Sequence, residues 1–175
     1  MICANAYRLV EHEGIDLYGL DLSIELVRRL IEHGVSGVSL IFAVSCNAAD
    51  NLLYGKAKRL IETLQLDGHF CLYDGPVDFA ALMTQCDIVL RPTSSDGDAL
   101  TVREALYFGI PVIASDAVER PEGTITFENR DIDCLLERTL NVLRNEIKPA
   151  PKVRPCDYDE YFEKYPRMYE EILSS

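Results

Sequence analysis

Residues 87–116 read DIVLRPTSSDGDALTVREALYFGIPVIASD, and this stretch carries the main signal for the fold. The apolar run at Ile88–Leu90 predicts a buried strand, and apolar residues at helical spacing predict a helix over Thr101–Phe108. Gly109 is a natural end for that helix, and the apolar run at Pro111–Ala114 predicts a second strand. A strand, a helix and another strand in succession are typical of a parallel sheet covered by helices.

The same alternation continues on both sides of this stretch. Strands are predicted at Val38–Val44, His69–Tyr73 and, from a weaker pattern, Thr124–Phe127. Helices are predicted at Gly19–His33, Asn51–Leu64, Phe79–Cys86 and Ile132–Leu143. The sequence therefore predicts an α/β fold, a Rossmann-like open parallel sheet with helices on both faces.

The chain has 175 residues, of which 48% are hydrophobic and 26% charged, which suits a globular domain with its own core. We expect that domain to occupy residues 1–147. The segment 148–156 contains three prolines and is predicted to be an extended linker. Residues 157–175 carry four tyrosines and a phenylalanine at roughly helical spacing, which predicts a C-terminal helix that must pack on something. Exposed aromatic residues on that helix favour a dimer if no other surface covers them.

The composition disfavours several classes of protein. A formal net charge of −12 repels phosphate backbones, so we expect no nucleic-acid partner. Neither a leader segment nor an apolar run of about 20 residues is present, which favours a cytoplasmic protein. The six cysteines include no C-x-x-C pair and the three histidines are scattered, so we expect no metal and no cofactor.

The loop and helix start after Ile88–Leu90 are suited to an anion. A helix that begins near Leu100 offers free backbone amides and the positive end of its dipole, and Gly97 allows close backbone approach. One turn beyond Thr101, the Glu104 carboxylate could accept hydrogen bonds from the hydroxyls of a ribose.

Asp96, in the loop, could accept hydrogen bonds from a sugar. Two structural alternatives stay open, because Thr101-x-x-Glu104 is also a capping box and Asp96-Gly97 is also an ordinary turn. Neither G-x-G-x-x-G nor G-x-x-x-x-G-K-[ST] occurs, which disfavours a dinucleotide oxidoreductase and a P-loop enzyme.

Taken together, these motifs resemble the retaining glycosyltransferases of the group 1 family, whose GT-B fold has two Rossmann-like halves. The donor half of that family carries P-S-x-x-E-G-x-x-L-x-x-x-E-A-x-x-x-G-x-P-V-I-A-S. This chain has Pro92 to Ala105 as PTSSDGDALTVREA and Gly109 to Ser115 as GIPVIAS, correctly spaced. Variants of the form R-P-T-x-x-D-G-D and R-P-E-G-T, here at Arg91–Asp98 and Arg120–Thr124, resemble a bacterial branch that assembles surface polysaccharides.

The resemblance implies roles for individual residues. Glu104 would bind the ribose hydroxyls of a nucleotide, Asp96 would contact the transferred sugar, and Arg8 would neutralise the leaving diphosphate. We class Asp96 and Arg8 as the catalytic candidates on that basis. The other candidates would bind the donor substrate through the loop, the helix start or the glycine turn after a strand: Gly97, Asp98, Ala99, Leu100, Thr101 and Gly75.

The chain departs from the family pattern in three ways. Asp96 stands where the family has glutamate, which shortens the side chain by one methylene. The family places a lysine before a glycine near the start of this half, but either register gives Glu13 or Tyr18 there, before Gly14 or Gly19. Arg91 or Arg103 could supply the missing charge, although an exposed helix surface is the favoured interpretation of Arg103. We also expect that the half which normally precedes the donor half and binds the acceptor is not part of this sequence.

These observations predict the donor-binding half of a hexosyltransferase that uses a nucleoside-diphosphate sugar and acts on a polysaccharide or lipid-linked acceptor. We expect the chain alone to bind the nucleotide-sugar but to be inactive without the N-terminal acceptor-binding domain. The intact enzyme would work in the cytoplasm or at the inner face of the membrane. Two alternatives stay open: a non-catalytic nucleotide-sugar-binding or interaction module, and half of a nucleotide-sugar epimerase with the same fold.

Overall fold

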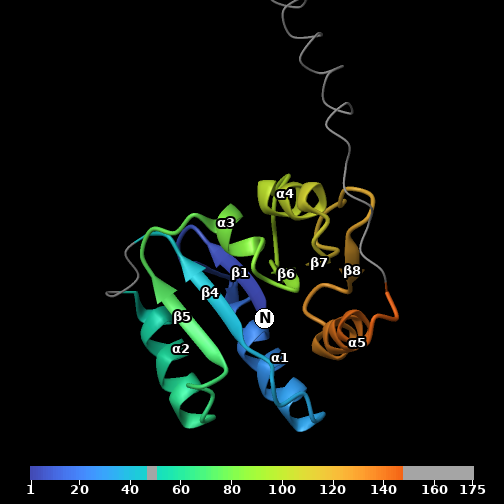
Figure 1. The fold of residues 1–175 in the computed structure, drawn as a ribbon. Helices are drawn as coiled ribbons and strands as arrows, with labels where there is room; N and C mark the ends of the chain where they lie inside the picture. Colours follow the sequence, from blue (N-terminus) through green and yellow to red (C-terminus); the bar gives the residue numbers. More distant parts are fainter. Residues whose placement is uncertain (47–50, 148–175) are drawn as a thin grey trace, which may run out of the picture.

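Six parallel strands form the sheet of this protein (Figure 1). The computed structural model describes residues 1–46 and 51–147. In the order in which they lie side by side, the strands are β5 (Phe70–Asp74), β4 (Leu40–Val44), β1 (Ile2–Ala6), β6 (Ile88–Arg91), β7 (Val112–Ser115) and β8 (Ile125–Phe127). A separate antiparallel pair, β2 (Glu11–His12) and β3 (Ile15–Asp16), follows β1.

Helices cover both faces of the sheet. On one face, α1 (Leu20–Glu32), α2 (Leu52–Thr63) and α5 (Ile132–Leu143) share a core with alternate strand residues such as Phe42 and Ile113. On the other face, α3 (Phe79–Met83) and α4 (Leu100–Phe108) pack with the strand residues whose side chains point to that face. The predicted fold class, a Rossmann-like parallel sheet between two helical layers, is confirmed.

The alternation of side chains along β1 shows how the two cores arise. Side chains alternate across a strand, so Ile2, Ala4 and Ala6 join the core under α1 while Cys3 joins the core under α4. All four are buried, which requires helices on both faces of this strand.

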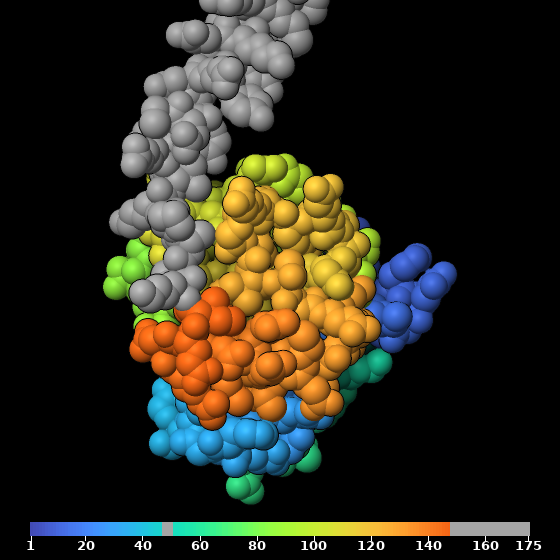
Figure 2. Space-filling model, turned by 90° about the vertical axis from the view of Figure 1, so that its right-hand side faces the viewer, coloured from blue at the N-terminus to red at the C-terminus, as the bar shows by residue number. Residues whose placement is uncertain are grey.

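The side of the molecule shown in Figure 2 is formed by α5, drawn in orange, and by the yellow-orange segment that precedes it, and α1 packs beside α5. Arg29 on α1 bonds to Asp133 on α5, and Arg130 before α5 bonds to Asp21 on α1. The segment with β2 and β3 projects from this body at the blue end of the colour scale. None of the helices in residues 1–46 and 51–147 has the length and apolar character needed to cross a membrane.

Most predicted elements are present with ends shifted by one or two residues. The helix predicted at Phe79–Cys86 is shorter than expected, because its last turn closes at Thr84. The central strand β1 and the β2–β3 pair were not predicted at all. The predicted linker at 148–156 and the predicted helix at 157–175 lie outside the described residues.

Candidate functional site

The strand order places a switch point between β1 and β6. From β1 the chain moves outward through β4 and β5, then returns to lay β6 on the other side of β1. In open parallel sheets, ligands bind where the connections diverge at the carboxyl ends of the strands. Here Asn5 and Arg91 stand at those two ends, and Arg91 Nη1 lies 3.4 Å from the backbone oxygen of Asn5 and 3.5 Å from its Oδ1.

A buried ionic cluster is centred on Asp96 beside this switch point. Arg91 donates from Nε and Nη2 to the two carboxylate oxygens, both at 2.9 Å. Arg120, from the loop after β7, donates from Nη1 to Asp96 Oδ2 at 3.0 Å. The Thr93 hydroxyl and the Gly97 amide add bonds of 3.1 and 3.0 Å. These five donors fill the acceptor capacity of the carboxylate, which has about four lone-pair sites.

The charge state of Asp96 follows from these partners. Burial works to raise the pKa of its carboxyl, but the hydrogen bonds and positive charge of Arg91 and then Arg120 outweigh burial and lower the pKa to about 2. The group is therefore ionised throughout the neutral range. The implied contact between Asp96 and a transferred sugar stays a prediction, since protein donors already hold both oxygens.

A pH dependence of stability follows from this lowered pKa. A carboxyl whose pKa falls on folding stabilises the folded state above its ordinary value of 3.8, and this contribution is lost as pH falls toward about 2. The loss amounts to about 2 kcal/mol. Urea unfolding between pH 4 and pH 2 should therefore show a shallower loss of stability for Asp96→Asn than for the wild type. Glu137→Gln, which removes an exposed carboxylate on α5, should keep the wild-type slope; an equal slope in all three would contradict the assignment.

The start of α4 borders the same cluster. Its N-cap residue is Ala99, and no side chain in the described part of the protein caps the first turn. Thr101 donates its hydroxyl to Asn5 Oδ1 at 3.3 Å, so the capping box considered from the sequence is not formed. The other alternative, an Asp96-Gly97 turn, agrees with the bond from the Gly97 amide to Asp96. The amide groups at this helix end are free of side-chain caps and are suited to hold an anion.

Glu104 lies one turn further along α4 and is half-buried. No hydrogen bond or ion pair joins its carboxylate to another side chain in residues 1–46 and 51–147. Arg8, which follows β1, is exposed and likewise has no such partner within the described ranges. Gly75 directly follows β5 and has φ of 146°, a conformation that favours glycine, and its amide donates to the Val44 oxygen.

The loop 97–99 is open on its outer side. A Cβ on Gly97 would meet no atom within 4 Å, so neither the fold nor packing requires glycine there. Asp98 is exposed and bonds to Arg103 Nε at 2.8 and 3.0 Å, and this bond lowers the pKa of its carboxyl. Gly97, Asp98, Arg103 and Arg120 border a surface hollow of about 400 Å³. Leu100, at the start of α4, is 72% exposed.

The segment before α1 packs directly on the segment after β6. An ideal Cβ on Gly19 would lie 2.1 Å from the Pro92 oxygen, and the ring of Tyr18 lies 5.5 Å from the Arg91 guanidinium carbon. The site therefore includes residues to which sequence reasoning assigned no role: Asn5, Thr93, Ser115 and Arg120. The R-P-E-G-T motif was the one signal available for Arg120.

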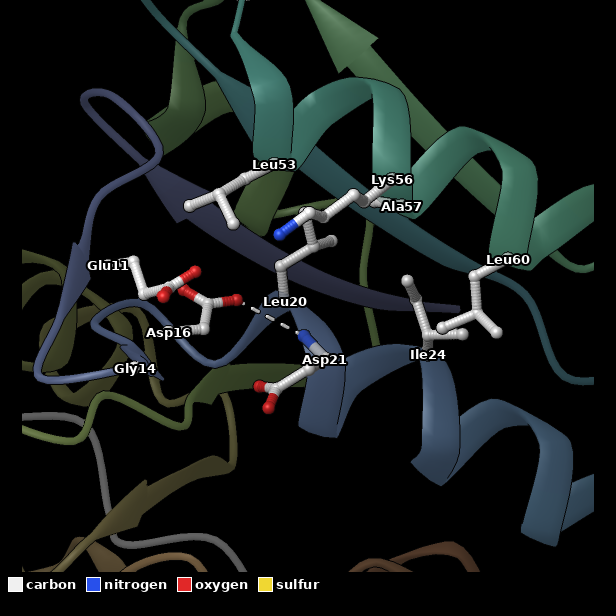
Figure 3. Close-up of a pocket in the computed structure, with 10 residues that line it drawn as sticks. All are labelled: Glu11, Gly14, Asp16, Leu20, Asp21, Ile24, Leu53, Lys56, Ala57 and Leu60. Carbon is white, nitrogen blue, oxygen red and sulfur yellow. Dashed lines mark hydrogen bonds between the residues drawn. The ribbon is translucent and has the colours of Figure 1, made fainter.

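A second hollow, of about 200 Å³, lies between the starts of α1 and α2 (Figure 3). Leu20, Ile24 and Leu53 form apolar walls, while Glu11 and Asp16 lie at one end. The Asp16 carboxylate accepts bonds from the amides of Tyr18 and Asp21, at 3.0 and 3.2 Å. Burial, followed by the charge of Asp21, raises the pKa of Asp16. These bonds make Asp16 part of the turn into α1.

Within the described residues, no group of three His, Cys, Asp or Glu side chains is placed to hold a metal ion.

The family of the chain follows from comparison with known proteins. A family model described as glycosyl transferases group 1 matches residues 13–146, which is most of the chain. The chain belongs to this family. A sequence search against curated proteins found no match.

Solved structures confirm the fold of this group 1 glycosyltransferase domain. The C-terminal domain of the group 1 family protein LpcC from Francisella tularensis aligns with a TM-score of 0.68 at 14% identity, covering 83% of this chain and 76% of that one. A glycosyltransferase from Rickettsia africae aligns with a TM-score of 0.67 at 14% identity, covering 84% and 38%. Anabaena HepE, in complex with UDP and glucose, aligns with a TM-score of 0.65 at 15% identity, covering 83% and 39%. The chain thus spans less than two fifths of the length of the last two proteins.

Proposed function

We propose that this chain is the donor-binding half of a retaining glycosyltransferase that takes a hexose from a nucleoside-diphosphate sugar. The acceptor would be a growing polysaccharide or a lipid-linked sugar, and the intact enzyme would act in the cytoplasm of a bacterium. A second domain would bind the acceptor, so the chain alone would bind the donor with little turnover. Family membership and the partial coverage of larger glycosyltransferases support this proposal.

The observation that carries the proposal is the half-buried carboxylate of Glu104, one turn along a helix whose first amides have no side-chain cap. A carboxylate can accept hydrogen bonds from both hydroxyls of a ribose, while the helix start can hold the phosphates. The same helix would thereby bind both the ribose and the phosphates of a nucleotide. The glycine turn at Gly75, at the end of β5, would contact the base through its backbone.

Catalysis would rest on stabilising negative charge on the departing diphosphate. The positive end of the α4 dipole and the exposed Arg8 guanidinium would both act on that group. Gly97 and Ala99 would let the backbone approach the sugar phosphate closely, and Asp98 would lie at the rim. No metal ion is assigned a role in this proposal.

A non-catalytic nucleotide-sugar-binding module is the second candidate. The observation in its favour is that either Glu13 or Tyr18, before Gly14 or Gly19, stands where the family pattern has a lysine. Turnover by the intact protein separates the two candidates, because the module would bind the donor without transferring or hydrolysing the sugar.

Glu104→Ala tests the proposed function. Calorimetric titration of the full chain with UDP, GDP, ADP, CMP and dTDP should show binding of at least one nucleotide. The variant should bind that nucleotide about 10-fold more weakly or worse, because it loses charge-assisted hydrogen bonds to the ribose. Glu137→Ala, on an exposed position of α5, is the matched control and should bind normally. Unchanged binding by Glu104→Ala would exclude the ribose role.

A further inference from the structure

The cluster around Asp96 carries more positive than negative charge. Arg91 and Arg120 both pair with this single carboxylate, and their side chains are 12% and 3% exposed. Within the described residues, neither guanidinium has an ion pair with a second carboxylate. A buried positive charge is costly unless an anion accompanies it. The excess of one charge at a ligand-binding edge of the sheet therefore points to an anionic ligand.

The two arginines differ in what their nitrogen atoms can still bind. Arg120 donates Nε to the Ser115 oxygen at 2.8 Å, Nη1 to Asp96, and Nη2 to Thr93 Oγ1 at 3.2 Å. Arg91 uses Nε and Nη2 for Asp96, while Nη1 makes only the two long contacts with Asn5. Arg91 Nη1 is therefore the group of this cluster that is best placed to donate to a ligand.

Arg91 Nη1 also lies beside the start of α4. Asn5 Oδ1 is 3.5 Å from Arg91 Nη1 and 3.3 Å from the Thr101 hydroxyl, so one oxygen atom separates the guanidinium from the first turn of the helix. An anion held by the amides of that turn would come within reach of the guanidinium. The helix dipole and the arginine would then act on the same group.

Tyr18 fixes the orientation of the guanidinium from a third side. Its ring lies 5.5 Å from the guanidinium carbon, within the range of a cation–π contact. Asp96 fixes the plane of the Arg91 guanidinium by accepting two hydrogen bonds of 2.9 Å from it. The side chain is thus pre-organised before a ligand arrives, which lowers the entropic cost of using it.

We propose that Arg91 supplies positive charge to the diphosphate of the bound donor, held in place by Asp96 and Tyr18. This inference rests on the proposed donor-binding function and adds a residue to it. The guanidinium provides from β6 the charge that the sequence lacks where Glu13 or Tyr18 replaces the lysine of the family pattern. It binds the diphosphate through Nη1 and leaves its other contacts with Asp96 unchanged.

Arg91→Gln tests the proposal, because glutamine keeps hydrogen-bonding capacity toward Asp96 but removes the charge. The NMR titration of the full chain uses whichever of UDP, GDP, ADP, CMP and dTDP the wild type binds most tightly, and the variant should bind that nucleotide about 10-fold more weakly or worse, as for loss of a charged hydrogen bond. Binding of the corresponding nucleoside, which has no phosphate, should stay within about twofold, and the salt dependence of nucleotide binding should become shallower. Arg91→Lys should fall between the two. Arg144→Gln removes an exposed charge at the end of α5 and is the matched control.

The outcomes separate this inference from the proposed function. If Arg91→Gln binds that nucleotide with the affinity and salt dependence of the wild type, while Glu104→Ala loses it, the inference fails and the donor site stands. If binding of the nucleotide and of its nucleoside weakens in parallel in Arg91→Gln, the residue is structural and the inference also fails. If the wild type binds none of UDP, GDP, ADP, CMP and dTDP, the proposed function fails and this inference with it.

Discussion

Asp96→Ala is expected to destabilise the domain by about 3 kcal/mol or more, because it leaves two buried guanidinium groups without their shared counter-charge. Arg120 would suffer most, since its side chain is 3% exposed and water cannot replace the lost carboxylate. Thr93 would also lose the acceptor of its hydroxyl. Urea unfolding at pH 7, followed by circular dichroism, measures the effect.

Asp98→Ala is the matched control for this prediction. Its carboxylate also pairs with an arginine, but the two side chains are 64% and 47% exposed, so water screens the pair and its loss should change stability little. A loss of stability in Asp96→Ala no larger than in Asp98→Ala would contradict a structural role for the cluster. It would favour the simpler view that Asp96 is an ordinary ligand-binding residue.

Much of the sheet and its helices could be predicted from the sequence because their residues follow strong periods. Val38–Val44 is an apolar run, and Ile132–Leu143 has one apolar face, so both were placed to within two residues. The strand β1 was missed for the opposite reason. Its sequence, ICANA, has small residues and one asparagine, and nothing in it resembles a strand former apart from Ile2. It becomes a central strand because β4 and β6 pair with it on both sides.

The site divides in the same way between local and long-range features. The helix start at Leu100, the glycine end at Gly109 and the position of Glu104 depend on local sequence, and the structure has both helix ends where the pattern placed them. The partners of Asp96 depend on tertiary structure, since Arg120 lies 24 residues further along the chain. The polar contact that links Arg91 with Thr101 passes through Asn5, which lies on the strand that was not predicted.

This division explains why Asp96 looked like a free acceptor in the sequence. An acidic residue before a glycine is usually exposed in a turn. Arg91 is the one arginine near Asp96 in the preceding sequence that could have indicated an ion pair instead. The guanidinium of Arg91 lies at the end of a buried strand, where a charge needs a partner. The requirement for that partner follows from burial, and burial of a strand end is decided by its neighbours in the sheet.

Gly19→Ala is expected to have the other large effect, a destabilisation of about 3 kcal/mol or more, from strain and overpacking combined. Gly19 has φ of 69°, which disfavours any residue with a Cβ, and an added Cβ would lie 2.1 Å from the Pro92 oxygen. That oxygen belongs to the backbone, so it cannot move aside as a side chain would. The amide of Ser94 also bonds to the Leu17 oxygen at 2.9 Å, which holds the two segments together.

Two other glycines separate the two causes. Gly34 has φ of 83°, and a Cβ added there would have no atom within 4 Å. Gly34→Ala should therefore show the conformational strain alone, a loss of about 1 kcal/mol. Gly37→Ala meets neither obstacle and should leave stability within about 0.5 kcal/mol of the wild type. The midpoint of urea unfolding measures the stability of all three variants, provided that the dependence of the unfolding free energy on urea concentration is the same in each. If Gly19→Ala lost no more stability than Gly34→Ala, the 91–94 segment would be free to shift, and Tyr18 could not hold Arg91 in a fixed place.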